Sequence, residues 1–171
     1  LAGPFTPMLF LGEEWGASTP FQFFTDHDDE LGEAVRKGRR GEFARHGWDE
    51  ADVPDPQAEA TYRRSQLDWS ELDSERGETL LAVYRSLALL RRTVPELTDP
   101  RFLRTSCRVD EDARFFSMTR GDVQLVVNFG SDAVTARIPV GELLFTTPSG
   151  VATGDGLLRV PAHGGALFRR G

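Results

Sequence analysis

The chain has 171 residues, of which 39% are hydrophobic and 27% are charged, as in an ordinary globular protein. Its 20 lysines and arginines and 27 acidic side chains give a net charge of −7, which argues against nonspecific binding to nucleic acid or to an anionic membrane. The single cysteine, Cys107, excludes an intrachain disulfide and a zinc site built on several cysteines. We expect Cys107 to be buried as a small hydrophobic residue.

The first eleven residues are mostly apolar and begin at Leu1 without a methionine. We expect the sequence to be a fragment of a longer chain, with a trimmed terminus as the alternative. Residues 6–11 (TPMLFL) are typical of a strand that is buried on both faces in a parallel sheet. No apolar run approaches the roughly 20 residues of a membrane span, and Pro4, Pro7 and Glu13 interrupt any signal-peptide core. We therefore expect a cytoplasmic location.

Two helices are predicted in the middle of the chain. Residues 31–45 carry acidic residues early and basic residues late, as the helix dipole favours. Residues 48–72 contain prolines and scattered aspartates and are expected to form a long irregular loop. The clearest helix covers residues 75–93, with Ser74 as its N-cap and Pro95 as its stop. Its apolar stripe has helical spacing and comprises Leu80, Val83, Tyr84, Leu87 and Leu90.

After Pro100 the chain consists of short apolar runs separated by Gly and Asp. Runs at a spacing of about 8–12 residues predict an antiparallel β-sandwich or meander. The expected strands cover residues 114–119, 123–129, 133–138, 142–146, 157–160 and 166–169. Five phenylalanines in or next to these runs are expected in the core, namely Phe115, Phe116, Phe129, Phe145 and Phe168. A boundary near residues 97–100 separates this all-β domain from a remnant of an α/β fold.

The first candidate site is the segment Gly12–Gly16 (GEEWG), which follows the first apolar run. Carboxylates accept hydrogen bonds from sugar hydroxyls, and an indole face stacks on the apolar face of a pyranose ring. The segment is therefore consistent with sugar recognition. The alternative is a solvated loop in which Trp15 covers the top of the core.

The second candidate site joins the aromatic stretch 21–24 to the acidic run 26–30, which contains His27. It fits the rim of a sugar cleft, an oxygen-rich metal site, or a solvated helix start at which acidic residues are stabilised. The third candidate is the basic stretch from Lys37 to Arg45 with the nearby Trp48, which fits either nucleic-acid binding or a solvated helix face. The acidic net charge favours the helix face.

The run of residues 4–27 (PFTPMLFLGEEWGASTPFQFFTDH) resembles the malto-oligosyltrehalose trehalohydrolase family, in the α-amylase clan of glycoside hydrolases. Further stretches carry the same resemblance: VPDPQ at 53–57, SQLDW at 65–69 and VVNFG at 126–130. The Gly-Glu-Glu element is shared widely in the clan, whereas the whole run of residues 12–27 is more specific. The resemblance extends over nearly all of the chain.

The resemblance implies that residues 1–98 are the last strand and helix of a (β/α)₈ TIM barrel and that residues 99–171 form a C-terminal antiparallel β-sandwich. It implies a glycosidase that cleaves the α-1,4-glucosidic bond next to the terminal trehalose of maltooligosyl trehalose and releases trehalose. The family uses an Asp nucleophile, a Glu acid/base and a second Asp, all of which precede the eighth barrel strand. We therefore expect no catalytic residue in this chain, no activity of the chain alone, no cofactor and no metal.

The resemblance also assigns six residues to one wall of the substrate cleft: Glu13, Glu14, Trp15, Phe24, Asp26 and His27. Asp26 and His27 are expected to hydrogen-bond sugar hydroxyls, and Trp15 is expected to stack on the sugar or to shape the site. The expected partners are maltooligosyl trehalose or a related α-glucan, and a complementing barrel fragment, because a lone barrel strand leaves its backbone unpaired. Nucleic acid and membrane are not expected partners. The alternatives are a non-catalytic carbohydrate-binding or scaffolding module and a bare stability domain.

Overall fold

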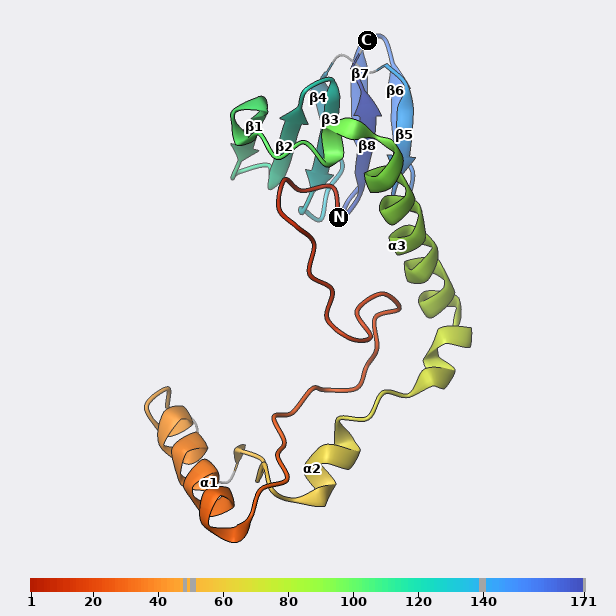
Figure 1. Ribbon diagram of the computed structural model, residues 1–171. Helices are drawn as coiled ribbons and strands as arrows, with labels where there is room; N and C mark the ends of the chain where they lie inside the picture. The colour runs from red at the N-terminus through yellow and green to blue at the C-terminus, as the bar shows by residue number, and fades with distance from the viewer. Residues whose placement is uncertain (48, 50–51, 139–140, 171) are drawn as a thin grey trace. The chain divides into compact units, whose positions relative to one another are not determined.

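The computed structural model describes residues 1–47, 49, 52–138 and 141–170 (Figure 1). The chain divides into two compact units. The first unit comprises Leu1–Glu14 together with Glu78–Gly171, and the second comprises Trp15–Gly77. The division into residues 1–98 and 99–171 rests on the change in sequence pattern near residues 97–100 and on the family resemblance, and it stays a prediction.

The first unit contains two antiparallel sheets, in agreement with the predicted all-β domain (Figure 1). The larger sheet has the strand order β1-β2-β3-β8-β5, and the smaller has the order β4-β7-β6. The strands are β1 (Thr105–Asp110), β2 (Phe115–Arg120), β3 (Val123–Asn128), β4 (Val134–Arg137), β5 (Leu143–Thr146), β6 (Ala152–Gly154), β7 (Leu157–Val160) and β8 (Gly165–Arg169). Six of these strands match the expected runs. The sequence did not predict β1, which is mostly polar, or β6, which has only three residues.

Two apolar clusters cover opposite faces of the larger sheet, because neighbouring residues of a strand point to opposite faces. The cluster between the two sheets consists of Val126, Ile138, Leu158, Val160, Ala166 and Phe168. The cluster on the other face consists of Ala2, Val94, Leu97, Val123 and Leu167. Among the five phenylalanines expected in the core, Phe168 is fully buried and three are half-buried. The prediction is wrong for Phe129, which is 61% exposed because it follows the end of β3.

Helix α3 (Glu75–Thr93) has the predicted bounds. The Ser74 hydroxyl accepts a hydrogen bond from the backbone N–H of Gly77 at 3.0 Å, which confirms the predicted cap. Two short 3₁₀ helices, η3 (Pro95–Leu97) and η4 (Phe102–Arg104), connect α3 to β1. No helix within the described ranges is long and apolar enough to cross a membrane.

The second unit contains α1 (Asp29–Ala44), α2 (Glu59–Arg64) and η2 (Trp69–Asp73). Helix α1 matches the predicted charged helix. The expectation of an irregular loop over residues 48–72 is wrong, because α2 and η2 lie within or overlap that range. Both elements are short, and η2 begins where Asp68 accepts a hydrogen bond from the backbone N–H of Ser70 at 3.0 Å.

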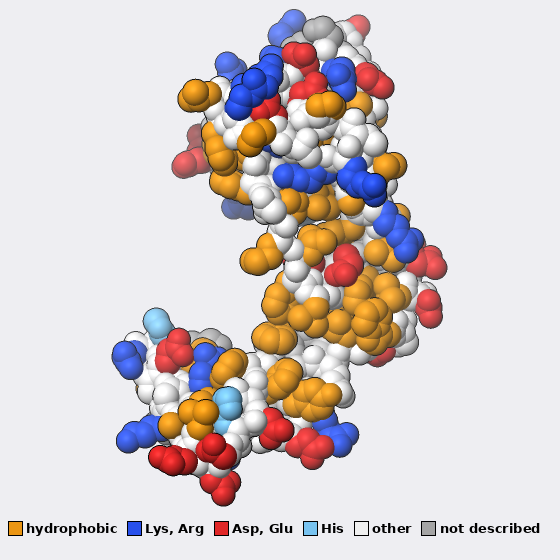
Figure 2. Space-filling model, in the orientation of Figure 1, with side chains coloured by type: hydrophobic (Ala, Val, Ile, Leu, Met, Phe, Trp, Pro, Cys, Tyr) orange, Lys and Arg blue, Asp and Glu red, His pale blue; other side chains and the backbone are white. Residues whose placement is uncertain are grey.

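Residues 6–11 form no strand in the described structure, so the prediction of a buried strand is wrong. Their side chains lie on the surface, where Met8 is 92% exposed and the three residues after it are about half exposed. A strand needs a neighbour for its backbone hydrogen bonds, and within the described ranges no strand pairs with this segment. Figure 2 shows hydrophobic side chains on the surface in view.

Cys107 is exposed, so the prediction that it is buried is also wrong. It lies on β1, the outermost strand of the larger sheet, where the burial of the side chains is low at every position. An outermost strand has a neighbouring strand on one side only, and the side chains of β1 are mostly exposed.

Two arginines of the first unit hold the N-terminal residues through backbone carbonyls. The Arg91 guanidinium donates hydrogen bonds of 2.6–2.9 Å to the carbonyls of Leu1, Gly3 and Phe5. The Arg120 guanidinium, in a side chain that is only 3% exposed, donates bonds of 2.8–3.1 Å to the carbonyls of Gly3, Leu97 and Asp99. Burial, together with the positive charge of Arg91, lowers the pKa of Arg120.

Candidate functional site

Glu13 and Glu14, the paired carboxylates of the candidate site, lie at the end of the N-terminal segment of the first unit. The carboxylate of Glu13 accepts one hydrogen bond from the backbone N–H of Phe10 and one from the hydroxyl of Tyr84 on α3, both at 3.0 Å. Burial, and then the bond to Glu13, raise the pKa of Tyr84. Glu13 therefore fixes the turn at residues 10–13 against α3.

Glu14 is half-buried and differs from its neighbour in its hydrogen bonding. Its Oε2 atom is buried and has no hydrogen-bond partner among the residues that the structure describes. A buried carboxylate oxygen without a donor is costly, so a hydroxyl group or a water molecule there is favourable. Of the two carboxylates, Glu14 has the spare acceptor.

Trp15 begins the second unit and is 4% exposed. Its ring packs on that of Trp69, with a centroid distance of 5.1 Å and a tilt of 35°. The indole N–H of Trp15 has no acceptor within the described part of the chain. Burial favours the interpretation that Trp15 shapes the site. Trp69, which is 65% exposed, offers the open indole surface instead, and sequence reasoning missed it although it ends the SQLDW stretch.

The chain between Trp15 and Phe23 is held by side chains from the region of α2 and η2. The backbone N–H of Ser18 donates to the Glu71 carboxylate at 2.9 Å, and the Ser18 hydroxyl donates to the other oxygen of the same carboxylate. The backbone N–H of Gln22 donates to the Ser65 hydroxyl at 3.0 Å. These contacts give the segment a fixed path although it is neither helix nor strand.

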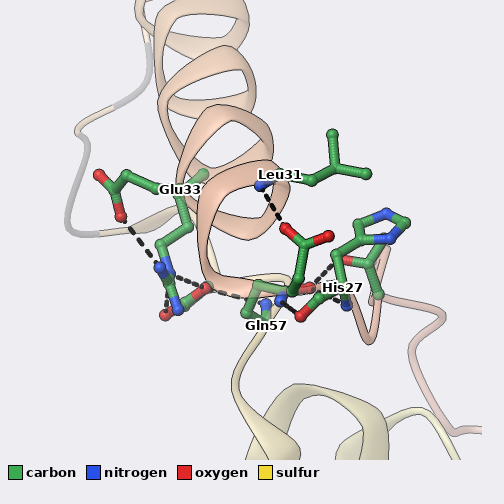
Figure 3. Close-up of polar contacts among 8 residues, drawn as sticks. His27, Leu31, Glu33 and Gln57 are labelled. Atoms are coloured by element: carbon green, nitrogen blue, oxygen red, sulfur yellow. Dashed lines mark hydrogen bonds and ion pairs between the residues drawn. The ribbon is translucent and has the colours of Figure 1, made fainter.

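One amide side chain organises the turn that precedes α1 (Figure 3). The side-chain oxygen of Gln57 accepts hydrogen bonds from the Thr25 hydroxyl at 2.5 Å and from the backbone N–H of His27 at 3.3 Å. The Gln57 amide nitrogen donates to the carbonyl of His27 at 3.0 Å. Asp28 then caps α1 by accepting from the N–H of Leu31 at 2.9 Å. Gln57 belongs to the VPDPQ stretch, which was the only sequence signal for this role.

Three of the candidate cleft residues lie on the surface around this turn. The His27 imidazole is exposed and points away from Gln57 in Figure 3. The Asp26 carboxylate is also exposed, and within the described ranges neither side chain has a hydrogen-bond or ion-pair partner. Phe24 is 38% exposed and packs edge-on against Tyr62 at a centroid distance of 5.2 Å. The turn therefore exposes an acid and an imidazole, two and three residues after a partly exposed aromatic ring that packs on Tyr62.

The rest of the acidic run is explained by the start of α1. Asp28 is the N-cap, and Asp29 and Glu30 occupy the first turn, where the helix dipole stabilises acids. The described residues contain no group of three or more His, Cys, Asp or Glu side chains arranged for a metal ion. These contacts support the helix-start interpretation of Asp28 to Glu30.

Two arginines of α1, Arg36 next to the basic stretch and Arg39 within it, make contacts inside the second unit. The Arg36 Nε lies 3.0 Å from both carboxylate oxygens of Asp55. Burial alone would raise the pKa of Asp55, but hydrogen bonds from the backbone of Gln57 and from Arg36 outweigh it and lower the pKa. Arg39 lies over the rings of Phe23 and Phe43, at 4.8 and 4.7 Å. These pairings favour the helix-face interpretation; Trp48, which belonged to the nucleic-acid hypothesis, lies outside the described residues.

A hollow of about 280 Å³ lies beside this stretch in the second unit. It is lined by Phe21, Gln22, Phe23, Arg39, Phe43, Asp52, Val53 and Pro54. The side-chain oxygen of Gln22 is buried and lacks a hydrogen-bond partner in the described part of the chain. The volume is near the lower end of the range for small-molecule sites.

Comparison with proteins of known sequence gives consistent matches. Residues 100–167 match the family described as a domain of unknown function (DUF3459). A malto-oligosyltrehalose trehalohydrolase of Rhizobium sp. is 46% identical over 170 residues, and one of Mycobacterium tuberculosis is 40% identical over 170 residues. Each match covers 99% of this chain but only 28% and 29% of the relative, so the chain spans less than a third of these curated proteins.

Comparison with solved structures points the same way. The crystal structure of a putative α-amylase from Salmonella typhimurium matches with a TM-score of 0.75 and 34% identity, covering 95% of this chain and 27% of that one. A mutant isomaltulose synthase from Erwinia rhapontici matches with a TM-score of 0.60 over 99% of this chain and 36% of that one. At 17% identity, the second likeness concerns the fold alone.

Proposed function

We propose that this chain is part of a glycosidase. The premise is its homology to the malto-oligosyltrehalose trehalohydrolases over 99% of its length. The proposed enzyme cleaves the α-1,4-glucosidic bond next to the terminal trehalose of maltooligosyl trehalose and releases trehalose. The observation that carries this proposal is the identity of 40–46% over nearly the whole chain.

Within that enzyme, the chain supplies one wall of the substrate cleft. The open side chains of Asp26 and His27, beside Phe24, are suited to hydrogen-bonding and packing against a sugar. The unpartnered oxygen of Glu14 is suited to accept a hydrogen bond from a sugar hydroxyl. The three catalytic carboxylates belong to other parts of the enzyme, so the chain alone is inactive.

Residues 6–11, which form no strand in this chain, are proposed to pair as the last strand of a (β/α)₈ barrel once the neighbouring barrel strands are present, and α3 is proposed to be the last helix of that barrel. The support is the exposure of the apolar side chains from Phe5 to Leu11, of which Phe5 is 70% and Met8 is 92% exposed. A contiguous apolar surface of this kind marks an interaction site. The partner that fits is a barrel fragment whose neighbouring strands supply the missing backbone hydrogen bonds.

The first experiment measures trehalose release from maltotriosyl trehalose by the purified 171-residue chain. We expect no turnover by the chain alone. We expect turnover once the chain is coexpressed with the remaining portion of a homologous trehalohydrolase. Turnover by the chain alone would refute the proposal that the catalytic carboxylates lie elsewhere.

The complementation assay also tests the proposed barrel strand. Met8→Lys places a charge in the exposed apolar segment and should abolish complex formation, because burying an unpaired charge is costly. Phe129→Lys is the control, since Phe129 is 61% exposed in the turn after β3. If both variants form the complex equally well, residues 6–11 are not a barrel strand.

In the complemented enzyme, Asp26→Asn tests the cleft wall. A hydrogen bond to a charged group contributes about 1.5–3 kcal/mol, so kcat/KM should fall about tenfold or more. Asp112→Asn, in the exposed turn between β1 and β2, makes the same change outside the proposed wall. Equal kcat/KM values for the two variants would remove Asp26 from the cleft.

A further inference from the structure

A second and larger hollow, of about 540 Å³, lies on the β domain of the first unit. It sits on the face of the larger sheet that also bears Val126 and Phe168, opposite to the face that bears Leu167. Its walls come from β1, β2 and β3 and from the end of β4. The volume falls within the range of small-molecule sites.

The hollow exists because the apolar core ends before the edge of the sheet. The smaller sheet contributes core residues against β3 and β8, whereas β1 contributes none. At the edge formed by β1 and β2, visible in Figure 1, the side chains of this face are polar except for that of Phe115. On these two strands Ser106 pairs with Thr119 and Arg108 pairs with Ser117.

The floor of the hollow carries polar groups without partners. Ser117 is only 8% exposed, yet its hydroxyl has no hydrogen-bond partner among the residues that the structure describes. Thr119 and Gln124, which also line the hollow and pair across β2 and β3, have no side-chain hydrogen bond within the described ranges either. The side chains of Ser117, Thr119 and Gln124 open onto the hollow and are available to hydrogen-bond a ligand or water there.

The rim of the hollow is positively charged, in contrast to the chain as a whole. Arg108 and Arg137 have no ion pair or hydrogen bond from their side chains in the described part of the chain. Arg170, also at the rim, donates to the carbonyl of Gly121 at 2.8 Å. The described lining residues include three arginines and one acidic residue, Asp110. Arg170 also lies 4.0 Å from the carboxylate of Asp122, so the cationic groups left for a ligand are those of Arg108 and Arg137. Guanidinium groups bind phosphate oxygens in a bidentate manner.

We propose that this hollow binds a small phosphorylated sugar or similar organic phosphate. The phosphate contacts Arg108 and Arg137 at the rim, and Ser117, Thr119 and Gln124 hydrogen-bond the polar body of the ligand on the floor. The proposal is independent of the glycosidase function, because it uses none of the proposed cleft residues.

Isothermal titration of the full 171-residue chain tests the proposal, with glucose 6-phosphate, inorganic phosphate and glucose as probes. We expect saturable binding of glucose 6-phosphate at one site, weaker binding of inorganic phosphate, and no binding of glucose. The absence of saturable binding of glucose 6-phosphate would overturn the proposal. Equal binding of glucose and of its phosphate would also overturn it, because the arginines would then play no part.

Two sets of variants separate the site from a general effect of charge. Arg108→Ala combined with Arg137→Ala should weaken binding at least tenfold. Arg85→Ala combined with Arg92→Ala removes the same charge from exposed positions on α3 and should leave the affinity unchanged. Equal affinities of the two double variants would refute the site.

Ser117→Ala distinguishes a ligand contact from a structural role. Since the hydroxyl has no hydrogen-bond partner among the described residues, its removal should leave the Tm unchanged or raise it, while the affinity for glucose 6-phosphate falls severalfold. A lowered Tm with unchanged affinity would assign the hydroxyl to folding and contradict the proposal.

Discussion

The replacement Asn128→Ala tests the packing of the β domain, because Asn128 is fully buried and joins three segments. Its amide nitrogen donates hydrogen bonds at 2.8, 3.2 and 2.9 Å to the carbonyls of Asp132, Val160 and Pro161. Its side-chain oxygen accepts a bond from the N–H of Gly130 at 2.9 Å. Alanine keeps the strand but removes all four bonds.

The expected cost follows from the groups that lose their partner. The N–H of Gly130 and the carbonyl of Val160 are both buried, and a buried polar group without a partner costs about 1–3 kcal/mol. Allowing for partial relaxation, Asn128→Ala should destabilise the β domain by about 2–4 kcal/mol. With an m-value of about 1–2 kcal/mol/M in urea, the midpoint falls by at least about 1 M.

The distribution of tryptophan provides an internal control. All three tryptophans, Trp15, Trp48 and Trp69, lie in the sequence of the second unit, so fluorescence reports on that unit alone. Far-UV circular dichroism also follows the sheets of the first unit. We expect Asn128→Ala to shift the unfolding transition seen by circular dichroism to lower urea concentration, while the transition seen by fluorescence stays in place. The control Thr135→Ala, at an exposed position of β4, should shift neither transition. A loss below about 0.5 kcal/mol would show that the four bonds do not hold the domain together.

Two further predictions concern helix glycines and acid stability. Gly38 lies in α1 with open space around its Cα, so Gly38→Ala should stabilise the chain by about 0.5–1 kcal/mol. Gly77→Ala should destabilise the chain, because the added Cβ would lie 2.3 Å from the carbonyl oxygen of Glu71. Thermal unfolding of the two variants checks the sign of each change. The side-chain hydrogen bond from Arg101 holds the pKa of Asp99 well below its ordinary value of 3.8. A lowered folded-state pKa contributes stability above pH 3.8 that is lost as the pH falls further. Tm should therefore fall less steeply below pH 4 in Asp99→Asn than in the unaltered chain, and parallel curves would contradict the assignment.

Local sequence patterns predicted the regular elements well. The bounds of α3 follow from its cap at Ser74 and its stop at Pro95, and six strands follow from apolar runs between turn residues. The patterns failed where neighbours decide the structure. Residues 6–11 read as a buried strand because of their composition, but a strand also needs a paired neighbour, which composition does not reveal. Cys107 and Phe129 were misplaced for a similar reason, since the edge of a sheet and the end of a strand expose residues that would be buried in the middle.

The candidate site was predictable in outline only. The residues Glu13, Asp26 and His27 stood out through their chemistry, and the run that contains them carried the resemblance. The roles of Gln57 and Trp69 depend on contacts across 30 residues or more, such as the bond between Gln57 and His27, and no spacing rule finds these. Likewise, the hollow between β1 and β4 arises from the place where the core ends, which depends on the pairing of strands.

The grip of Arg91 and Arg120 on the first residues of the chain uses only backbone oxygens. Every amino acid has a backbone carbonyl, so these hydrogen bonds depend on the backbone conformation of the segment and not on the identity of its side chains. Apart from Ala2, which is buried in the core, the first few positions are therefore open to substitution without loss of attachment. The two side chains that hold the first residues lie about 90 to 120 residues later in the sequence. Substitution of either arginine should therefore weaken the attachment of the N-terminal segment far more than substitution within the segment itself.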